Sequence, residues 1–157
     1  MVEIITKSPE ETEEFGKKLA SMLLSGDIIS FKGDLGAGKT CMIRGISRGL
    51  GVKSNITSSS FVLMRVLEGE KMVYHFDLYR LSDREELLDI GYDEFMFSDG
   101  ISLVEWPEKM GDWIGNSYLE VNIKYDFDTM EVCDRVIRLV PHGKRFEELL
   151  EKLVVKK

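Results

Sequence analysis

The fold is decided by the stretch Gly33-Asp34-Leu35-Gly36-Ala37-Gly38-Lys39-Thr40. This stretch matches G-x-x-x-x-G-K-[ST], the phosphate-binding P-loop. Its glycines allow positive φ angles and a close approach of the backbone, so that N–H groups can converge on phosphate oxygens. The lysine brings a cation to the β- and γ-phosphates, and the threonine hydroxyl suits Mg²⁺. The stretch therefore predicts a binding site for a nucleoside triphosphate.

The residues on either side have the pattern that such a loop requires. Residues 27–32 read as a short buried strand, and apolar residues recur at helical spacing over 41–50. Gly51 suits the end of that helix. Because the helix follows the loop directly, the positive end of its dipole is predicted to face the bound anion. We expect Lys39 to lie exposed on the loop and to contribute little to the core.

The composition indicates a single globular domain over residues 1–157. The chain has 43% hydrophobic and 31% charged residues, which is typical of soluble proteins. It lacks an apolar run of about 18 residues and a leader with a basic and an apolar part, so we expect no membrane segment and a cytoplasmic location. Cys41 and Cys133 lie far apart without a C-x-x-C partner, which fits a reducing compartment.

The remaining sequence predicts helices and strands arranged around this unit. A first helix begins at Ser8 and Pro9, where Glu11 completes a capping box. Another helix begins near Ser82, and the last one lies over 146–153. Further strands are predicted over 61–67, 72–81, 101–104, 118–125 and 132–140, and the runs 61–67 with 72–81 and 118–125 with 132–140 read as antiparallel pairs. We therefore expect a three-layer α/β P-loop NTPase domain with a mainly parallel central sheet and antiparallel edge strands.

Two of these strands end in an acid. Asp77 lies at the end of an otherwise apolar strand, and Glu105 ends another strand just before Pro107. NTPases place a carboxylate for Mg²⁺ at the carboxyl end of a strand beside the P-loop strand. Both acids are candidates for this role, and a strand-end carboxylate that caps the following loop is the alternative for each.

Three motifs, taken together, resemble one protein family. They are the P-loop over 33–40, then His75-Phe76-Asp77-Leu78-Tyr79-Arg80, then Glu105-Trp106-Pro107-Glu108. In order and approximate spacing they are similar to those of the TsaE (YjeE) family, small bacterial ATPases of tRNA threonylcarbamoyladenosine biosynthesis. The resemblance covers the chain from the helix at Ser8 to about Val140.

The resemblance implies that the chain binds and hydrolyses ATP with Mg²⁺. Lys39, Asp77 and Glu105 would be the catalytic residues. Thr40 and Glu105 would bind the metal ion, and Asp77 would be needed for hydrolysis. The sequence does not rank the two acids, so either could take the other's role.

The resemblance also implies a set of residues around the nucleotide. Trp106 would lie beside it, Arg135 would lie near it, and Pro9 would flank the base. The complete set of implied contacts is Pro9, Asp34, Leu35, Gly36, Ala37, Gly38, Lys39, Thr40, Cys41, Trp106 and Arg135.

One segment departs from the family pattern. Residues 52–60 form a polar, hydroxyl-rich connector that reads as a solvated loop or as a switch segment near the γ-phosphate. The family usually has Ser-Pro-Thr-[FY] there, whereas this chain has Ser58-Ser59-Ser60-Phe61. Ser60 keeps a hydroxyl, but Ser59 lacks the fixed φ of proline.

The resemblance further implies protein partners. Family members act with the threonylcarbamoyl-transferase subunit and its inactive paralogue, and ATP hydrolysis would reset that complex. The net charge of −7 argues against broad direct contact with a nucleic-acid backbone, so tRNA would be reached only through these partners. We expect slow turnover in isolation, with an arginine from a partner or Arg135 within the chain as alternative sources of positive charge.

Three other functions stay open at this point. A small-molecule P-loop kinase would need an arginine-rich lid, but Arg44 and Arg48 belong to the P-loop helix. A GTPase-like switch has some support from Asp112-Trp113-Ile114-Gly115, which fits D-x-x-G, but the sequence has no N-K-x-D motif. A nucleotide-gated binding module would differ from an ATPase only in the dependence of turnover on a partner.

Overall fold

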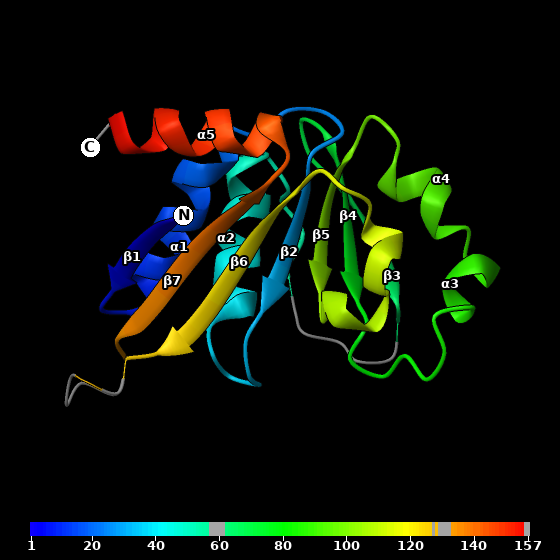
Figure 1. Cartoon of the computed structure of the whole chain (residues 1–157), viewed down its shortest axis with the longest axis horizontal. Helices are drawn as coiled ribbons and strands as arrows, with labels where there is room; N and C mark the ends of the chain where they lie inside the picture. Colours follow the sequence, from blue (N-terminus) through cyan, green and yellow to red (C-terminus); the bar gives the residue numbers. More distant parts are fainter. Residues whose placement is uncertain (57–61, 127, 129–132, 156–157) are drawn as a thin grey trace.

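The computed structural model describes residues 1–56, 62–126, 128 and 133–155. Within these residues, seven strands form one mixed sheet in the order β1-β7-β6-β2-β5-β4-β3 (Figure 1). The strands are β1 Val2–Thr6, β2 Ile28–Lys32, β3 Met64–Glu68, β4 Met72–Asp77, β5 Ile101–Glu105, β6 Tyr118–Tyr125 and β7 Arg135–His142. Residues 57–60 of the hydroxyl-rich connector, the adjacent Phe61, and residues 127 and 129–132 of the turn after Asp126 lie outside the described residues.

The centre of the sheet is parallel, as the sequence predicts. β6, β2, β5 and β4 run in the same direction, so their carboxyl ends meet at one edge. Antiparallel pairings complete the sheet, with β6–β7 and β7–β1 on one side and β4–β3 on the other. Both predicted antiparallel pairs are therefore confirmed as β3 with β4 and β6 with β7. β1 was not expected, although it pairs with β7 along its whole length.

Helices lie on both faces of the sheet but cover them unequally. α1 Pro9–Ala20, α2 Lys39–Gly49 and α5 Lys144–Val155 pack on one face and enclose the larger hydrophobic core. Short helices cover the other face over β2, β4 and β5, around Phe76 and Val104. They are α3 Glu86–Asp89, α4 Tyr92–Met96, and the 3₁₀ turns η1 Pro107–Lys109 and η2 Gly111–Ile114.

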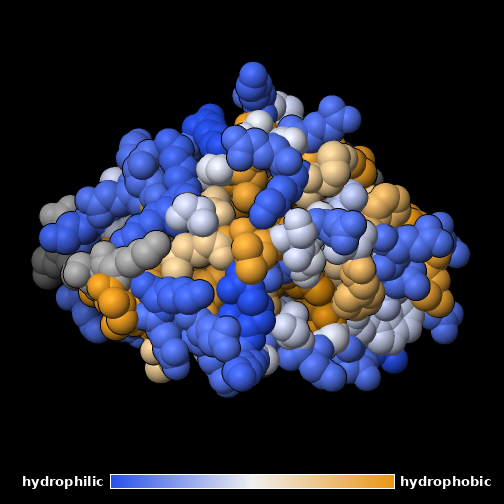
Figure 2. Space-filling model, turned by 90° about the horizontal axis from the view of Figure 1, so that it is seen from above, coloured by the Kyte–Doolittle hydropathy of each residue, from blue (hydrophilic) through white to orange (hydrophobic). Residues whose placement is uncertain are grey.

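The three-layer prediction therefore holds for only part of the sheet. Buried Ile123 and Ile137 alternate with exposed Lys124 and Arg138 in β6 and β7, so one face of these strands meets solvent. Figure 2 shows a surface on which hydrophilic side chains predominate, with smaller hydrophobic areas between them. Among the described residues, no helix has the length and apolar character needed to cross a membrane.

α1 and α2 approach each other closely through glycines. A Cβ atom placed on Gly45 would lie 2.0 Å from the carbonyl oxygen of Glu13, and one on Gly16 would lie 2.6 Å from that of Met42. Real Cβ atoms are not found at such distances from backbone atoms. The absence of side chains at these positions therefore allows α1 and α2 to pack closely against each other.

Gly45→Ala should destabilise the protein by about 2 kcal/mol, because the new methyl group must push α1 away from α2. Helix propensity alone predicts the opposite sign, a gain of about 1 kcal/mol. Urea denaturation measures the difference. Glu151→Ala, at an exposed position of α5, is the control and should change stability by less than about 0.5 kcal/mol. A stabilised Gly45→Ala variant would contradict the close packing of the two helices.

Candidate functional site

The P-loop has the conformation that its glycines predict. Gly33, Gly36 and Gly38 have φ angles of 154°, 80° and 113°. Gly38 is the residue that precedes α2, no side chain caps this end of the helix, and its first turn contains no acidic residue. The first N–H groups of a helix have no partner within the helix. The positive end of α2 is therefore available to an anion.

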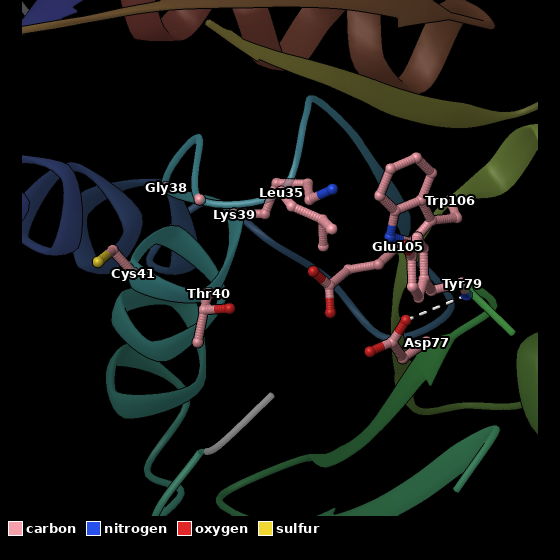
Figure 3. A pocket seen from close by; sticks show the side chains of 10 residues that line it. Leu35, Gly38, Lys39, Thr40, Cys41, Asp77, Tyr79, Glu105 and Trp106 are labelled. Atoms are coloured by element: carbon pink, nitrogen blue, oxygen red, sulfur yellow. Dashed lines mark hydrogen bonds between the residues drawn. The ribbon is translucent and has the colours of Figure 1, made fainter. Parts of the chain in front are cut away.

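A cleft of about 320 Å³ lies in front of this helix end. The residues that line it are Leu35, Gly36, Gly38, Lys39, Thr40, Cys41, Asp77, Tyr79, Glu105 and Trp106. All three motifs quoted from the sequence therefore meet at one place. In Figure 3 the Cys41 side chain points away from Asp77 and Glu105, so its thiol faces away from them.

Four of the predicted nucleotide contacts lie outside this cleft. Asp34 and Ala37 line a second cleft of about 390 Å³, and Trp106 lines both clefts. Arg135 contacts the P-loop backbone, where its Nε donates a hydrogen bond to the carbonyl oxygen of Ala37. Pro9 occupies the first turn of α1 and lines neither cleft.

Lys39 is buried, which corrects the expectation that it is exposed. Its side chain and backbone together are only 5% exposed. Its Nζ donates a hydrogen bond to the carbonyl oxygen of Gly33 and lies 3.9 Å from the centroid of the Trp106 ring. Burial lowers the pKa of Lys39, whereas the Glu105 and Asp77 carboxylates oppose that shift. Sequence reasoning missed this burial because it depends on a ring that belongs to a distant strand end.

The two predicted acids are neighbours. Asp77 and Glu105 are paired in the register of β4 and β5, at the carboxyl ends of these parallel strands. Figure 3 shows both carboxylates and the Thr40 hydroxyl directed toward the same space. Burial first, and then the Glu105 carboxylate, raise the pKa of Asp77, while the N–H of Tyr79 lowers it by donating to Oδ1 at 3.2 Å. The site therefore concentrates negative charge opposite the helix end.

His75 fixes the position of one of these acids. Its Nε2 lies 2.9 Å from Oε2 of Glu105, and both side chains are 6% exposed. The sequence assigned no role to His75. The available signal was its spacing, because His75 and Asp77 are two residues apart and therefore lie on the same face of β4.

Trp106 has a backbone conformation that is unusual for its side chain. Among the described non-glycine residues it alone has a positive φ, of 59°. A left-handed conformation is rare for a bulky residue and costs about 1–3 kcal/mol. Its ring lies 5.0 Å from that of Tyr79, at 47°. Tyr79 belongs to a quoted motif but was not assigned to the site. The strained turn directs the indole ring over Lys39.

Asp77→Asn should stabilise the protein without ligand at pH 8. The raised pKa means that the charged carboxylate is disfavoured in the folded state, so its ionisation removes stability as the pH rises through that pKa. Asparagine keeps the oxygen that accepts from Tyr79 and carries no charge. The gain should disappear below the ordinary pKa of 3.8, where both states are protonated. Thermal denaturation at several pH values measures it. Asp99→Asn, at an exposed position, is the control, and equal gains for both variants would contradict the account.

Comparisons with known proteins show the family to which the chain belongs. The model of the family "Threonylcarbamoyl adenosine biosynthesis protein TsaE" matches residues 6–135. Proteins named tRNA threonylcarbamoyladenosine biosynthesis protein TsaE are similar to the chain. That of Bacillus subtilis is 35% identical over 94% of the chain and 90% of its own length, and that of Haemophilus influenzae is 40% identical over 75% and 78%.

A solved structure is also similar over nearly the whole chain. The crystal structure of Bacillus subtilis YdiB aligns with a TM-score of 0.84 and 30% identity, covering 99% of this chain and 95% of that one. The family match extends from the last residue of β1 to the first residue of β7, and so includes the cleft, both acids and Trp106. The chain therefore belongs to the TsaE family of threonylcarbamoyl adenosine biosynthesis proteins.

Proposed function

We propose that the chain is a P-loop NTPase domain that binds and hydrolyses ATP with Mg²⁺ in tRNA threonylcarbamoyladenosine biosynthesis. One observation carries the proposal. The uncapped end of α2, the Lys39 side chain and two neighbouring carboxylates line the same cleft. Positive groups for phosphate and acids for a metal ion are what a nucleotide with its Mg²⁺ requires. The family membership supplies the biosynthetic context.

The proposed phosphate site consists of the P-loop backbone and Lys39. The N–H groups at the start of α2 would bind phosphate oxygens, and the helix dipole would favour their negative charge. Phosphate oxygens would compete with the carbonyl of Gly33 for the Lys39 ammonium. Because Lys39 is buried beside the Trp106 ring, its interaction with phosphate would be stronger than in solvent.

The residues opposite the P-loop fit Mg²⁺. No cluster of three His, Cys, Asp or Glu side chains suited to a metal occurs in the part of the chain that the structure describes. Mg²⁺ does not need one, because it commonly binds through one or two carboxylates together with substrate phosphates and water. The repulsion by which Glu105 raises the pKa of Asp77 marks a place where a divalent cation would be stabilised.

We assign Thr40 and Glu105 to the metal ion, with His75 holding Glu105 in place. Asp77 is then the candidate to orient the attacking water, although the opposite assignment of the two acids also fits their adjacent positions. The bound Mg²⁺ would neutralise charge on the β- and γ-phosphates during hydrolysis.

Lys39→Ala should weaken ATP binding at least tenfold and lower ATP turnover by about 10²–10³, because a positive group that stabilises the phosphates is lost. Calorimetric titration with Mg²⁺ and ATP, and release of phosphate, measure the two effects. Lys18→Ala, on the exposed side of α1, is the matched control and should bind ATP normally. Because Lys39 is buried, circular dichroism must confirm that the variant is folded. Unchanged affinity in a folded variant would contradict the proposal.

We further propose that turnover depends on the transferase subunit and its inactive paralogue. The net charge of −7 fits a protein surface better than bare tRNA. Arg135 donates to the backbone of the P-loop, so a positive group from a partner is the favoured source of further charge at the γ-phosphate. An arginine supplied by a partner raises turnover by about 10³–10⁵ in other P-loop systems.

Addition of both partners should therefore raise the steady-state rate of phosphate release above that of the isolated chain. An inactivated P-loop, as in Lys39→Ala, is the control for ATPase activity contributed by the partners themselves. Equal rates with and without the partners would reject partner activation. Transfer of phosphate to a small molecule instead of to water would indicate a kinase.

A further inference from the structure

We propose that Tyr125 and Arg135 are positioning residues that fix the P-loop from outside and so prepare it for phosphate. This inference rests on the proposed binding of a nucleotide. Both residues lie at the end of the β6–β7 pair, beside the loop that joins β2 to α2 (Figure 1). Neither lines the cleft between the P-loop and the two acids, so they would act through the loop's backbone.

The two side chains supply donors to consecutive carbonyl groups of the loop. The Tyr125 hydroxyl donates to the carbonyl oxygen of Gly36 at 2.8 Å. The Nε of Arg135 donates to the carbonyl oxygen of Ala37, also at 2.8 Å. A loop whose N–H groups converge on an anion turns carbonyl groups outward, and these need partners of their own. Tyr125 and Arg135 meet that need.

The sheet holds both donors in place before any ligand binds. Tyr125 and Arg135 are directly opposite each other in the antiparallel register of β6 and β7. The Arg135 guanidinium lies 3.9 Å from the centroid of the Tyr125 ring, which is a cation–π contact. The pair is therefore one unit, anchored in a sheet whose next strand, β2, leads into the loop.

These contacts determine the directions of the loop's N–H groups. Each peptide group is planar, so a fixed carbonyl also fixes the N–H of the following residue. The bond to the Ala37 carbonyl thus orients the N–H of Gly38, the residue that precedes α2. The bond to the Gly36 carbonyl orients the N–H of Ala37, which donates to the carbonyl oxygen of Asp34. Loss of either bond should leave the loop with more conformations to lose when it binds phosphate.

The glycines of the motif leave room for this support. A Cβ atom on Gly36 would lie 3.3 Å from the Tyr125 hydroxyl oxygen, and one on Gly38 would lie 3.9 Å from Nε of Arg135. The Tyr125 and Arg135 side chains therefore approach the loop beside glycines, which have no side chain of their own. This assigns Arg135 a role in shaping the loop, distinct from a direct contact with the γ-phosphate.

The test compares ADP with ATP. Tyr125→Phe removes only the hydroxyl group, and Arg135→Lys keeps the charge but loses the planar guanidinium. Each substitution should lower the affinities for ADP and for ATP by the same factor, about fivefold, which corresponds to the loss of one net hydrogen bond. Tyr118→Phe, at the other end of β6, is the matched control and should bind both nucleotides as the parent chain does. Calorimetric titration gives the affinities, and circular dichroism checks folding.

A second readout needs no nucleotide. Amide hydrogen exchange at Ala37, whose N–H donates to the carbonyl oxygen of Asp34, should be faster in Tyr125→Phe, while exchange in β2 stays unchanged. Unchanged affinities and exchange in both variants would overturn this inference but leave the proposed function intact. If Arg135→Lys lowered the affinity for ATP but not for ADP, that result would also overturn the inference, in favour of a contact between Arg135 and the γ-phosphate. A parent chain that binds neither ADP nor ATP would overturn the proposed function itself.

Discussion

The site depends on the pairing of β2 with β5 on one side and β6 on the other. Phe31 is paired with Glu105 and Lys32 with Asn122, so the acid and the end of β6 are brought to the residue where the P-loop begins. Because the central strands are parallel, every functional segment leaves the sheet at the same edge. The relative positions of the strand ends at the cleft are thus set by backbone hydrogen bonds between the strands.

The Lys39 ammonium and the two carboxylates are held close together in the cleft. Asp77 has a raised pKa because it is buried beside Glu105, and Lys39 is buried between the Gly33 carbonyl and the indole ring of Trp106. Trp106 itself has a disfavoured backbone conformation. Such features lower the stability of the free protein and are typical of functional sites. A ligand with both negative charge and a divalent cation would relieve the repulsion and replace the contacts of Lys39.

The sequence predicted those features that depend on neighbours along the chain. The glycines, lysine and threonine of the P-loop identified the loop, and strand ends identified Asp77 and Glu105 as a pair. Features that depend on contacts between distant segments were missed, because one sequence does not give the register between strands. The bond from His75 to Glu105, the burial of Lys39 under Trp106 and the support of the loop by Tyr125 are of this kind. The third layer is incomplete because β6 and β7 bury only one of their two faces, as the alternation of buried and exposed residues along these strands shows.

A crystal structure with Mn²⁺ and a non-hydrolysable ATP analogue would show directly whether the cleft binds a nucleotide with its metal ion. The anomalous signal of manganese locates the ion independently of the protein coordinates. We predict an anomalous peak about 2.1 Å from the Thr40 hydroxyl, with the ion bound directly or through water to Glu105 or Asp77 and the triphosphate at the start of α2. A triphosphate bound elsewhere, or a metal ion more than about 8 Å from both carboxylates, beyond contact through water, would contradict it.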